Sequence, residues 1–157
     1  LFSLASLFYC LHSFFNLLNI DYLCMFNQIK EKEMKKVIAT PDAPKAVGPY
    51  SQAIEVNGTL YISGQIPVNP ADGKVQEDIV AAAHQSLKNI GAILKEAGMT
   101  FDNVVKTTVL LADISDFKAV NEVYAEYFTG DKPARACYQA AALPLGVKVE
   151  IEAIAVK

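Results

Sequence analysis

Near the end of the chain stand two segments in which side-chain type alternates, Pro133-Ala134-Arg135-Ala136-Cys137-Tyr138-Gln139-Ala140 and Val147-Lys148-Val149-Glu150-Ile151-Glu152-Ala153-Ile154-Ala155-Val156. Alternation with a period of two is typical of β-strands, and we expect two strands joined by a turn over residues 143–146. Side chains two positions apart share a strand face, so Arg135 lies with Cys137, and Glu150 with Glu152. An arginine and two carboxylates are therefore expected to project from adjacent sheet surface.

Arg135 is the only arginine among the 14 Lys and Arg residues of the chain. A guanidinium binds a carboxylate or phosphate through two parallel hydrogen bonds, which an ammonium cannot do. Arg135 is therefore the first functional candidate. The alternative is a structural ion pair at an interface. If the turn centres on Leu145, Arg135 lies opposite Val156 rather than Glu150, which argues against a simple cross-strand pair.

Four further strands are expected upstream. Residues 37–39 form a short edge strand, and residues 51–56 and 59–63 form a hairpin around Asn57-Gly58, a dipeptide that favours a two-residue turn. Residues 104–111 are apolar and β-branched on both faces, which is typical of a buried central strand.

Two amphipathic helices are expected between these strands. Over residues 78–97, apolar side chains recur at spacings of three and four, and Gly98 is the expected stop. In the second helix Ser115 is the expected N-cap and Gly130 the expected end. The expected buried stripes are Val80, Ala83, Leu87, Ile90 and Leu94 in the first helix, and Phe117, Val120, Tyr124 and Phe128 in the second.

This order of elements predicts an α+β domain with one mixed six-stranded sheet and both helices on one face. The other face would be open, although its strands carry too many apolar residues to remain in water. Association through the open face is the simplest remedy. We therefore expect a homo-oligomer with sites built where chains meet.

The first 33 residues differ in composition from the rest. Residues 1–29 contain one charged side chain, Asp21, and seven of the 15 aromatic residues. We expect residues 1–33 to be a disordered or spurious extension, translated from upstream of a true start at Met34, and residues 34–157 to be the domain. The alternative is a membrane anchor over residues 1–18.

Composition and motifs restrict the chemistry of residues 34–157. Cys137 is the only cysteine there, which fits a reducing cytoplasm, and the net charge of −2 with no clustered basic run does not suggest a nucleic-acid partner. With His84 as the only histidine, no metal site is expected. No phosphate-binding loop, dinucleotide fingerprint or nucleophile elbow is present, so no cofactor is expected. Cys137 is expected to be a small buried thiol. Tyr50 either packs against its neighbours or directs its hydroxyl toward a ligand.

Six stretches together resemble the RidA family, also called the YjgF family, and in particular its reactive-intermediate (enamine/imine) deaminase branch. They occur in family order from about Lys36 to the C-terminus and cover the whole domain. The stretches are residues 48–52 (Gly-Pro-Tyr-Ser-Gln), 63–67 (Ser-Gly-Gln-Ile-Pro), 105–109 (Val-Lys-Thr-Thr-Val), 120–121 (Val-Asn), 133–137 (Pro-Ala-Arg-Ala-Cys) and 149–155 (Val-Glu-Ile-Glu-Ala-Ile-Ala).

The resemblance implies a chorismate-mutase-like homotrimer with active sites between subunits. It also implies hydrolysis of 2-aminoacrylate and 2-iminobutyrate, which enzymes such as threonine dehydratase release, to 2-keto acids and ammonia. Arg135 would hold the substrate carboxylate and Glu150 would activate water. The expected pocket residues are Tyr50, Ser63, Gly64, Asn121, Ala136 and Cys137.

Two other functions remain open. A non-catalytic protein could bind 2-keto acids in the same cleft, or act as a holdase chaperone for unfolded chains. Ribonuclease activity, suggested for some relatives, fits poorly with a net charge of −2 and a single histidine in the domain.

Overall fold

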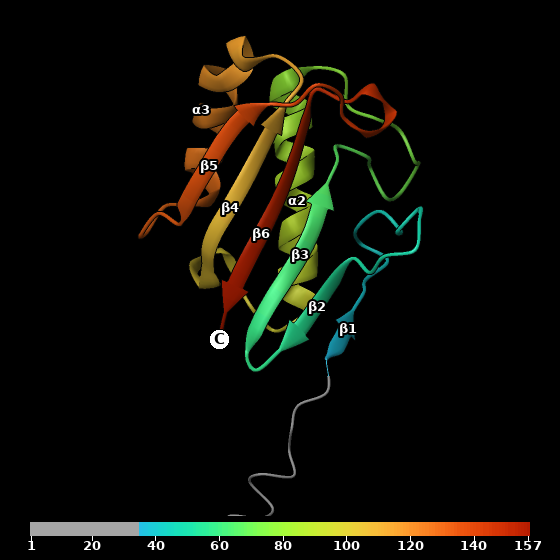
Figure 1. The fold of residues 1–157 in the computed structure, drawn as a ribbon, viewed down its shortest axis with the longest axis vertical. Helices are drawn as coiled ribbons and strands as arrows, with labels where there is room; N and C mark the ends of the chain where they lie inside the picture. The colour runs from blue at the N-terminus through green and yellow to red at the C-terminus, as the bar shows by residue number, and fades with distance from the viewer. Residues whose placement is uncertain (1–34) are drawn as a thin grey trace, which may run out of the picture. The chain divides into compact units, whose positions relative to one another are not determined.

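One mixed sheet with two helices on one face forms the domain (Figure 1). The structure is a computed structural model that describes residues 35–157, so the predictions for residues 1–33 lie outside the described part. The strands are β1 (Lys36–Ile38), β2 (Ala53–Val56), β3 (Thr59–Gln65), β4 (Val104–Leu111), β5 (Ala134–Gln139) and β6 (Val149–Val156), in the spatial order β1-β2-β3-β6-β4-β5. The predicted six-stranded α+β architecture is confirmed.

Within residues 35–157 the longer helix, α2 (Ile79–Glu96), begins and ends where its sequence predicts. The Asp78 carboxylate accepts a hydrogen bond from the Ala81 amide at 3.0 Å, and Gly98 adopts a φ of 70° beyond the last turn. Its apolar stripe packs on the sheet, where full burial of a Leu or Ile side chain contributes about 1.5 to 3 kcal/mol. Leu87, Ile90, Ile93 and Leu94 are completely buried, whereas Val80, in the first turn, is 43% exposed against prediction.

The second helix, α3 (Phe117–Tyr127), differs from prediction at both ends. Ser115 is not its cap: it lies in a 3₁₀ turn, Ile114–Asp116, where its amide donates to Asp113. At the other end Phe128 is the C-cap, two residues before Gly130. Val120, Tyr124 and Phe128 are buried as expected, but Phe117 is 40% exposed because it stands at the helix start.

The predicted hairpin between β2 and β3 is confirmed, since Asn57 and Gly58 adopt φ angles of 50° and 72° between the two antiparallel strands. The predicted hairpin between β5 and β6 is wrong. β4 lies between them, paired in parallel with β5 and antiparallel with β6. The crossover through α3 brings β5 alongside β4 in parallel, and β6 then adds to the free side of β4.

The sheet has one covered and one open face. Val109 and Ile151 are completely buried beneath the helices, while Tyr61 and Tyr138 on the other face are each about half exposed. β4 is interior within the sheet but not buried on both faces as predicted, because Lys106 is exposed. In Figure 1 the open face is turned toward the viewer, with α2 and α3 behind it. None of the helices within residues 35–157 has the length and apolar character needed to cross a membrane.

Candidate active site

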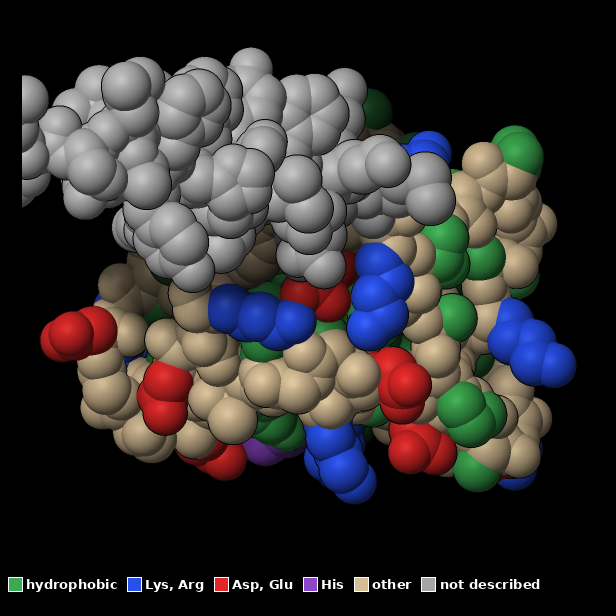
Figure 2. Space-filling model, turned by 90° about the horizontal axis from the view of Figure 1, so that it is seen from below, with side chains coloured by type: hydrophobic (Ala, Val, Ile, Leu, Met, Phe, Trp, Pro, Cys, Tyr) green, Lys and Arg blue, Asp and Glu red, His purple; other side chains and the backbone are tan. Residues whose placement is uncertain are grey.

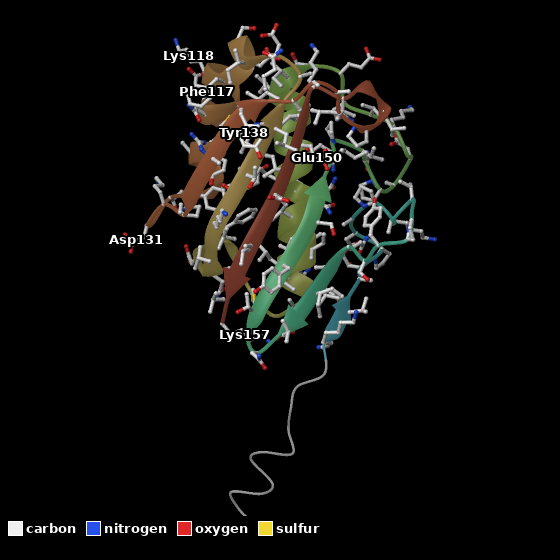
Figure 3. The ribbon with its side chains drawn as sticks, viewed as in Figure 1. Phe117, Lys118, Asp131, Tyr138, Glu150 and Lys157 are labelled. Carbon is white, nitrogen blue, oxygen red and sulfur yellow. The ribbon has the colours of Figure 1, made fainter. Side chains whose placement is uncertain are left out.

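A bulge in β3 places Gly64 against the side chain of Glu150. The β3–β6 register shifts between Ile62, which pairs with Ala153, and Gln65, which pairs with Ile151, leaving one extra residue on β3. Such bulges re-aim the local backbone. A Cβ atom built on Gly64 would lie 1.9 Å from Oε1 of Glu150, so only a glycine leaves room for this carboxyl group. Figure 3 shows Glu150 on β6, beside the end of β3.

The surroundings of Glu150 favour its protonated form. The side chain is half-buried, and loss of solvent raises the pKa of the carboxyl group above its ordinary value; repulsion from Glu152 raises this pKa further. A raised pKa brings a carboxyl group closer to neutral pH, where general acid and base catalysis is most effective.

Tyr50 and Ser63 lie on the same side of the domain as Gly64. The Ser63 hydroxyl donates to the carbonyl of Ser51 at 2.7 Å, which ties the bulge to the segment that carries Tyr50. Tyr50 is half exposed and lines a cavity of about 330 Å³ together with Gly64 and Leu145. The predicted residues Tyr50, Ser63, Gly64 and Glu150 thus lie together, as one half of the candidate site.

Two buried amides, which the sequence did not single out, hold the walls of this cavity. The Gln52 amide donates to the carbonyls of Thr40, Ala43 and Pro44, and its oxygen accepts from the Thr40 amide at 2.7 Å. Asn89, completely buried on α2, donates to the carbonyls of Ile66 and Val68 at 3.1 and 3.0 Å. Each amide fixes an irregular loop that would otherwise lack backbone partners.

Arg135 stands on the helix-covered side of β5 and contacts two aromatic rings of α3. Its guanidinium carbon lies 4.7 Å from the centroid of Tyr124 and 5.6 Å from that of Phe117, within the range of cation–π attraction. Among residues 35–157 no carboxylate lies at ion-pair distance from this guanidinium. The structural ion pair considered for Arg135 therefore has no support within the described chain.

The remaining predicted residues lie around Arg135. Asn121 is on the same face of α3 as Phe117 and Tyr124, at spacings of four and three. Cys137 shares the Arg135 side of β5, and Ala136 lies on the opposite side, with its backbone beside Thr108. Burial raises the pKa of the Cys137 thiol against the opposing effect of the Arg135 charge, so the thiol stays protonated.

One chain does not bring the two halves together. Arg135 is opposite Thr107, on the helix-covered side, whereas Glu150 is opposite Leu110 and faces the open side. The expectation that the arginine and the carboxylates share adjacent surface is therefore wrong, because alternation shows which residues share a face and not which strands are neighbours. In Figure 3, Phe117, the first residue of α3, is well separated from Glu150 on β6.

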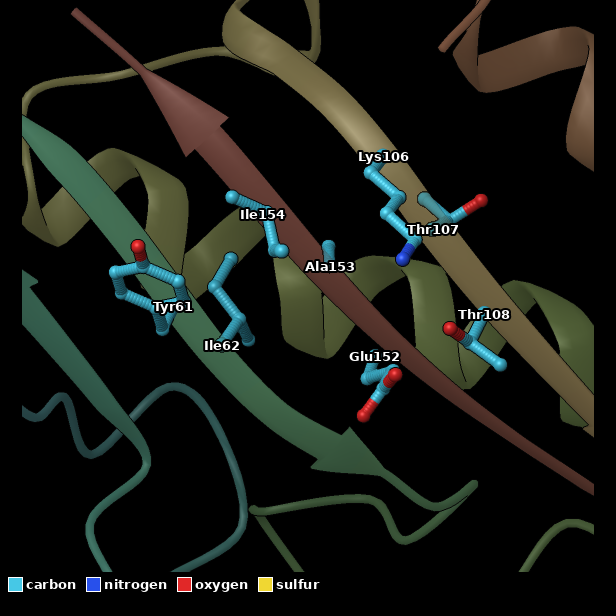
Figure 4. A pocket seen from close by; sticks show the side chains of 8 residues that line it. All are labelled: Tyr61, Ile62, Lys106, Thr107, Thr108, Glu152, Ala153 and Ile154. Carbon is cyan, nitrogen blue, oxygen red and sulfur yellow. The ribbon is translucent and has the colours of Figure 1, made fainter. Parts of the chain in front are cut away.

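The open face has a hollow of about 150 Å³ over β3, β6 and β4. Figure 4 shows its lining, with Lys106 and Thr108 from β4, Glu152 from β6 and Tyr61 from β3. The end of the molecule seen in Figure 2 has acidic and basic side chains interspersed rather than gathered by sign. Within residues 35–157 no three His, Cys, Asp or Glu side chains are grouped as metal ligands.

Comparisons with known proteins agree with this fold. Residues 40–157 match the family described as endoribonuclease L-PSP. Over 125 residues the chain is 60% identical to the 2-iminobutanoate/2-iminopropanoate deaminase of Mus musculus, an alignment that covers 79% of this chain and 93% of that protein.

Two solved structures have the same fold. The YyfA protein of Yersinia pestis, from the conserved Rid protein family, is 51% identical with a TM-score of 0.77, over 79% of this chain and all of the other. TdcF of E. coli, solved with bound serine, is 43% identical with a TM-score of 0.76, over 78% of this chain and 98% of the other.

Proposed function

Because the chain belongs to the endoribonuclease L-PSP family, we propose that it is an enamine/imine deaminase, which hydrolyses 2-aminoacrylate and 2-iminobutyrate to 2-keto acids and ammonia. The observation that carries this proposal is the Glu150 carboxyl group, packed on Gly64 and with a raised pKa, beside a cavity lined by Tyr50. The deaminase name of the mouse relative, which covers nearly the whole domain at 60% identity, supports the same chemistry.

The two halves of the site would meet between chains. Glu150 faces the open side of the sheet and Arg135 the other side, so a substrate that contacts both must lie between two copies. We propose a homotrimer with a chorismate-mutase-like arrangement, in which the cleft between neighbours receives Arg135 from one chain and Glu150 from the next. Half-exposed Tyr61 and Tyr138 on the open face favour such association. We also propose a cytoplasmic location, which the single cysteine of residues 34–157 supports.

The reaction converts R–C(=NH)–COO⁻ and water into R–CO–COO⁻ and ammonia. Arg135 would bind the carboxylate through two charge-assisted hydrogen bonds, each contributing about 1.5 to 3 kcal/mol. The Glu150 carboxylate would take a proton from water as the water oxygen bonds to C2 of the protonated imine. Glu150 would then give that proton to the amino nitrogen, the C–N bond would break, and ammonia would leave as the new hydroxyl loses its proton to the Glu150 carboxylate. Glu150 would release this proton to solvent, which balances the proton that the imine took up from solvent before the attack.

The chain needs no bound group for these steps, since proton transfer and a carboxylate contact are sufficient. The serine bound to TdcF is an amino acid with a carboxylate, as the proposed substrates are. By contrast, hydrolysis of RNA, which the family description suggests, would require phosphate contacts on a basic surface. Residues 34–157 carry a net charge of −2.

A coupled assay tests the proposal. Threonine dehydratase supplies 2-iminobutyrate, and the rate of its conversion to 2-ketobutyrate is compared with and without the protein. We expect a clear acceleration by the wild-type chain and little by Glu150→Gln. No acceleration, together with binding of 2-ketobutyrate in calorimetry, would favour the non-catalytic binding protein. Suppression of aggregation that is indifferent to Arg135 would favour the holdase.

A further inference from the structure

Arg135 is contacted by the aromatic ring of Tyr124, which is not one of the predicted site residues. The Tyr124 ring lies under its guanidinium carbon, at 4.7 Å, and Tyr124 itself is only 6% exposed. A ring that contacts the face of a guanidinium leaves the N–H groups at its edge available, because those donors lie in the guanidinium plane. Tyr124 can therefore hold Arg135 without competing for the donors that a carboxylate would use.

The Tyr124 ring is itself held at its hydroxyl and on a ring face. Its hydroxyl is 2.8 Å from Oγ1 of Thr107, in a buried contact. Its ring stacks on Phe128, with centroids 4.3 Å apart and planes inclined by 29°. Thr107 is also the residue opposite Arg135 in the β4–β5 register, so the same residue aligns the arginine backbone and the ring beneath its side chain.

The surroundings keep the Tyr124 hydroxyl neutral. Burial raises its pKa, and the hydrogen bond with Thr107 and the positive charge of Arg135 only partly oppose this effect. A neutral phenol can remain hydrogen-bonded to Thr107 throughout the pH range in which an imine hydrolase would work.

We propose that Tyr124, fixed by Thr107 and Phe128, is the positioning residue for Arg135: it sets the guanidinium plane so that its N–H edge meets the substrate carboxylate. This inference rests on the proposed function for the identity of the ligand. The contacts of Tyr124 with Arg135, Thr107 and Phe128 do not depend on it.

The test uses the fact that Arg135 is the only arginine of the full chain. A ¹⁵N-labelled protein therefore has a single arginine Nε–Hε signal, whose proton is displaced by the ring current of Tyr124. The variants are Tyr124→Leu, which removes the ring, and Tyr124→Phe and Thr107→Val, which remove only the hydrogen bond. Tyr127→Phe is the matched control, since this tyrosine also lies on α3 but its hydroxyl contacts His84.

We expect Tyr124→Leu to abolish the ring-current displacement and to raise KM for 2-iminobutyrate and Kd for 2-ketobutyrate by about tenfold, with a much smaller change in kcat. Tyr124→Phe should keep most of the displacement and most of the affinity. Thr107→Val should shift the Nε–Hε signal in the same direction as Tyr124→Leu does, but by less. Tyr127→Phe should change neither the signal position nor the affinity.

The proposal is overturned if Tyr124→Leu leaves the signal and Kd unchanged, or if Tyr127→Phe has the same effect. If Tyr124→Leu does not fold, an unmoved signal and an unchanged Kd in Thr107→Val overturn it instead. Failure of the proposed function has a different signature, namely a wild-type protein that binds 2-ketobutyrate without accelerating imine hydrolysis.

Discussion

Replacement of Gly64 by alanine should lower kcat while leaving the melting temperature nearly unchanged. The new Cβ would lie 1.9 Å from Oε1 of Glu150, and ordinary van der Waals contact begins at 3.4 Å, so the carboxyl oxygen must move by about 1.5 Å. Misplacement of a reacting group by about 1 Å can lower a rate about 100-fold, and loss of a general acid–base group typically costs about 10² to 10⁴. We expect kcat of Gly64→Ala to fall by about 100-fold.

The fold should tolerate this change. Gly64 is not among the residues with positive φ, and the atoms nearest the new methyl group belong to the end of a flexible, half-buried side chain. A compatible Gly→Ala change removes freedom from the unfolded chain and contributes about 0.4 to 1 kcal/mol of stability. The melting temperature should therefore remain close to that of the wild type.

The assay is the coupled conversion of 2-iminobutyrate, with thermal unfolding measured on the same samples. Gly130→Ala is the matched control, because a Cβ there would meet only Asp102, at 3.7 Å, and φ is not positive. Wild-type kcat in a folded Gly64→Ala protein would refute the role assigned to the Glu150 carboxyl group. Loss of activity in Gly130→Ala to the same extent would show that the effect is not local.

Arg135→Lys keeps the charge but loses the paired donors, so kcat/KM for 2-iminobutyrate should fall by about 100-fold; retention of full activity would contradict the carboxylate contact. Glu152→Gln removes a negative charge that raises the pKa of Glu150, so this pKa should fall. Because the carboxylate form of Glu150 is the base, the acidic limb of the kcat/KM profile should move to lower pH. An acidic limb that stays in place would argue against Glu150 as the titrating group. Gln52→Ala leaves the Thr40 amide and three carbonyls without their partner, so urea unfolding should show a loss of about 2 to 4 kcal/mol; a loss below about 1 kcal/mol would mean that water replaces the amide.

Local signals in the sequence predicted most elements, because turns and caps depend on neighbouring residues. Asn57-Gly58 and Asp78 marked a hairpin and a helix start that the structure contains. The partners of β5 and β6 were mispredicted, since a period of two identifies a strand and its faces without identifying its neighbour. The connection through α3, not the short segment after β5, determines that β5 pairs with β4.

The residues of the candidate site were also predicted only in part. The lone arginine and the family motifs pointed to Arg135 and Glu150, although not to their placement on opposite faces of the sheet. Gln52 and Asn89 were not identified, because each acts through loop carbonyls that lie 8 to 23 residues away in the sequence. Tyr124 was predicted only as a core residue, and its contact with Arg135 depends on the crossover that the sequence pattern does not specify.

Mixing of two inactive variants tests most directly whether the site is shared between chains. Arg135→Lys and Glu150→Gln chains are co-expressed in equal amounts, mixed oligomers are isolated, and imine hydrolysis is compared with that of each variant alone. If each cleft takes Arg135 from one chain and Glu150 from its neighbour, each mixed trimer has one cleft of three with both native residues, and about a third of wild-type activity should return. If both residues acted within one chain, every site would carry a substitution, and mixed oligomers no more active than the separate variants would contradict a shared cleft.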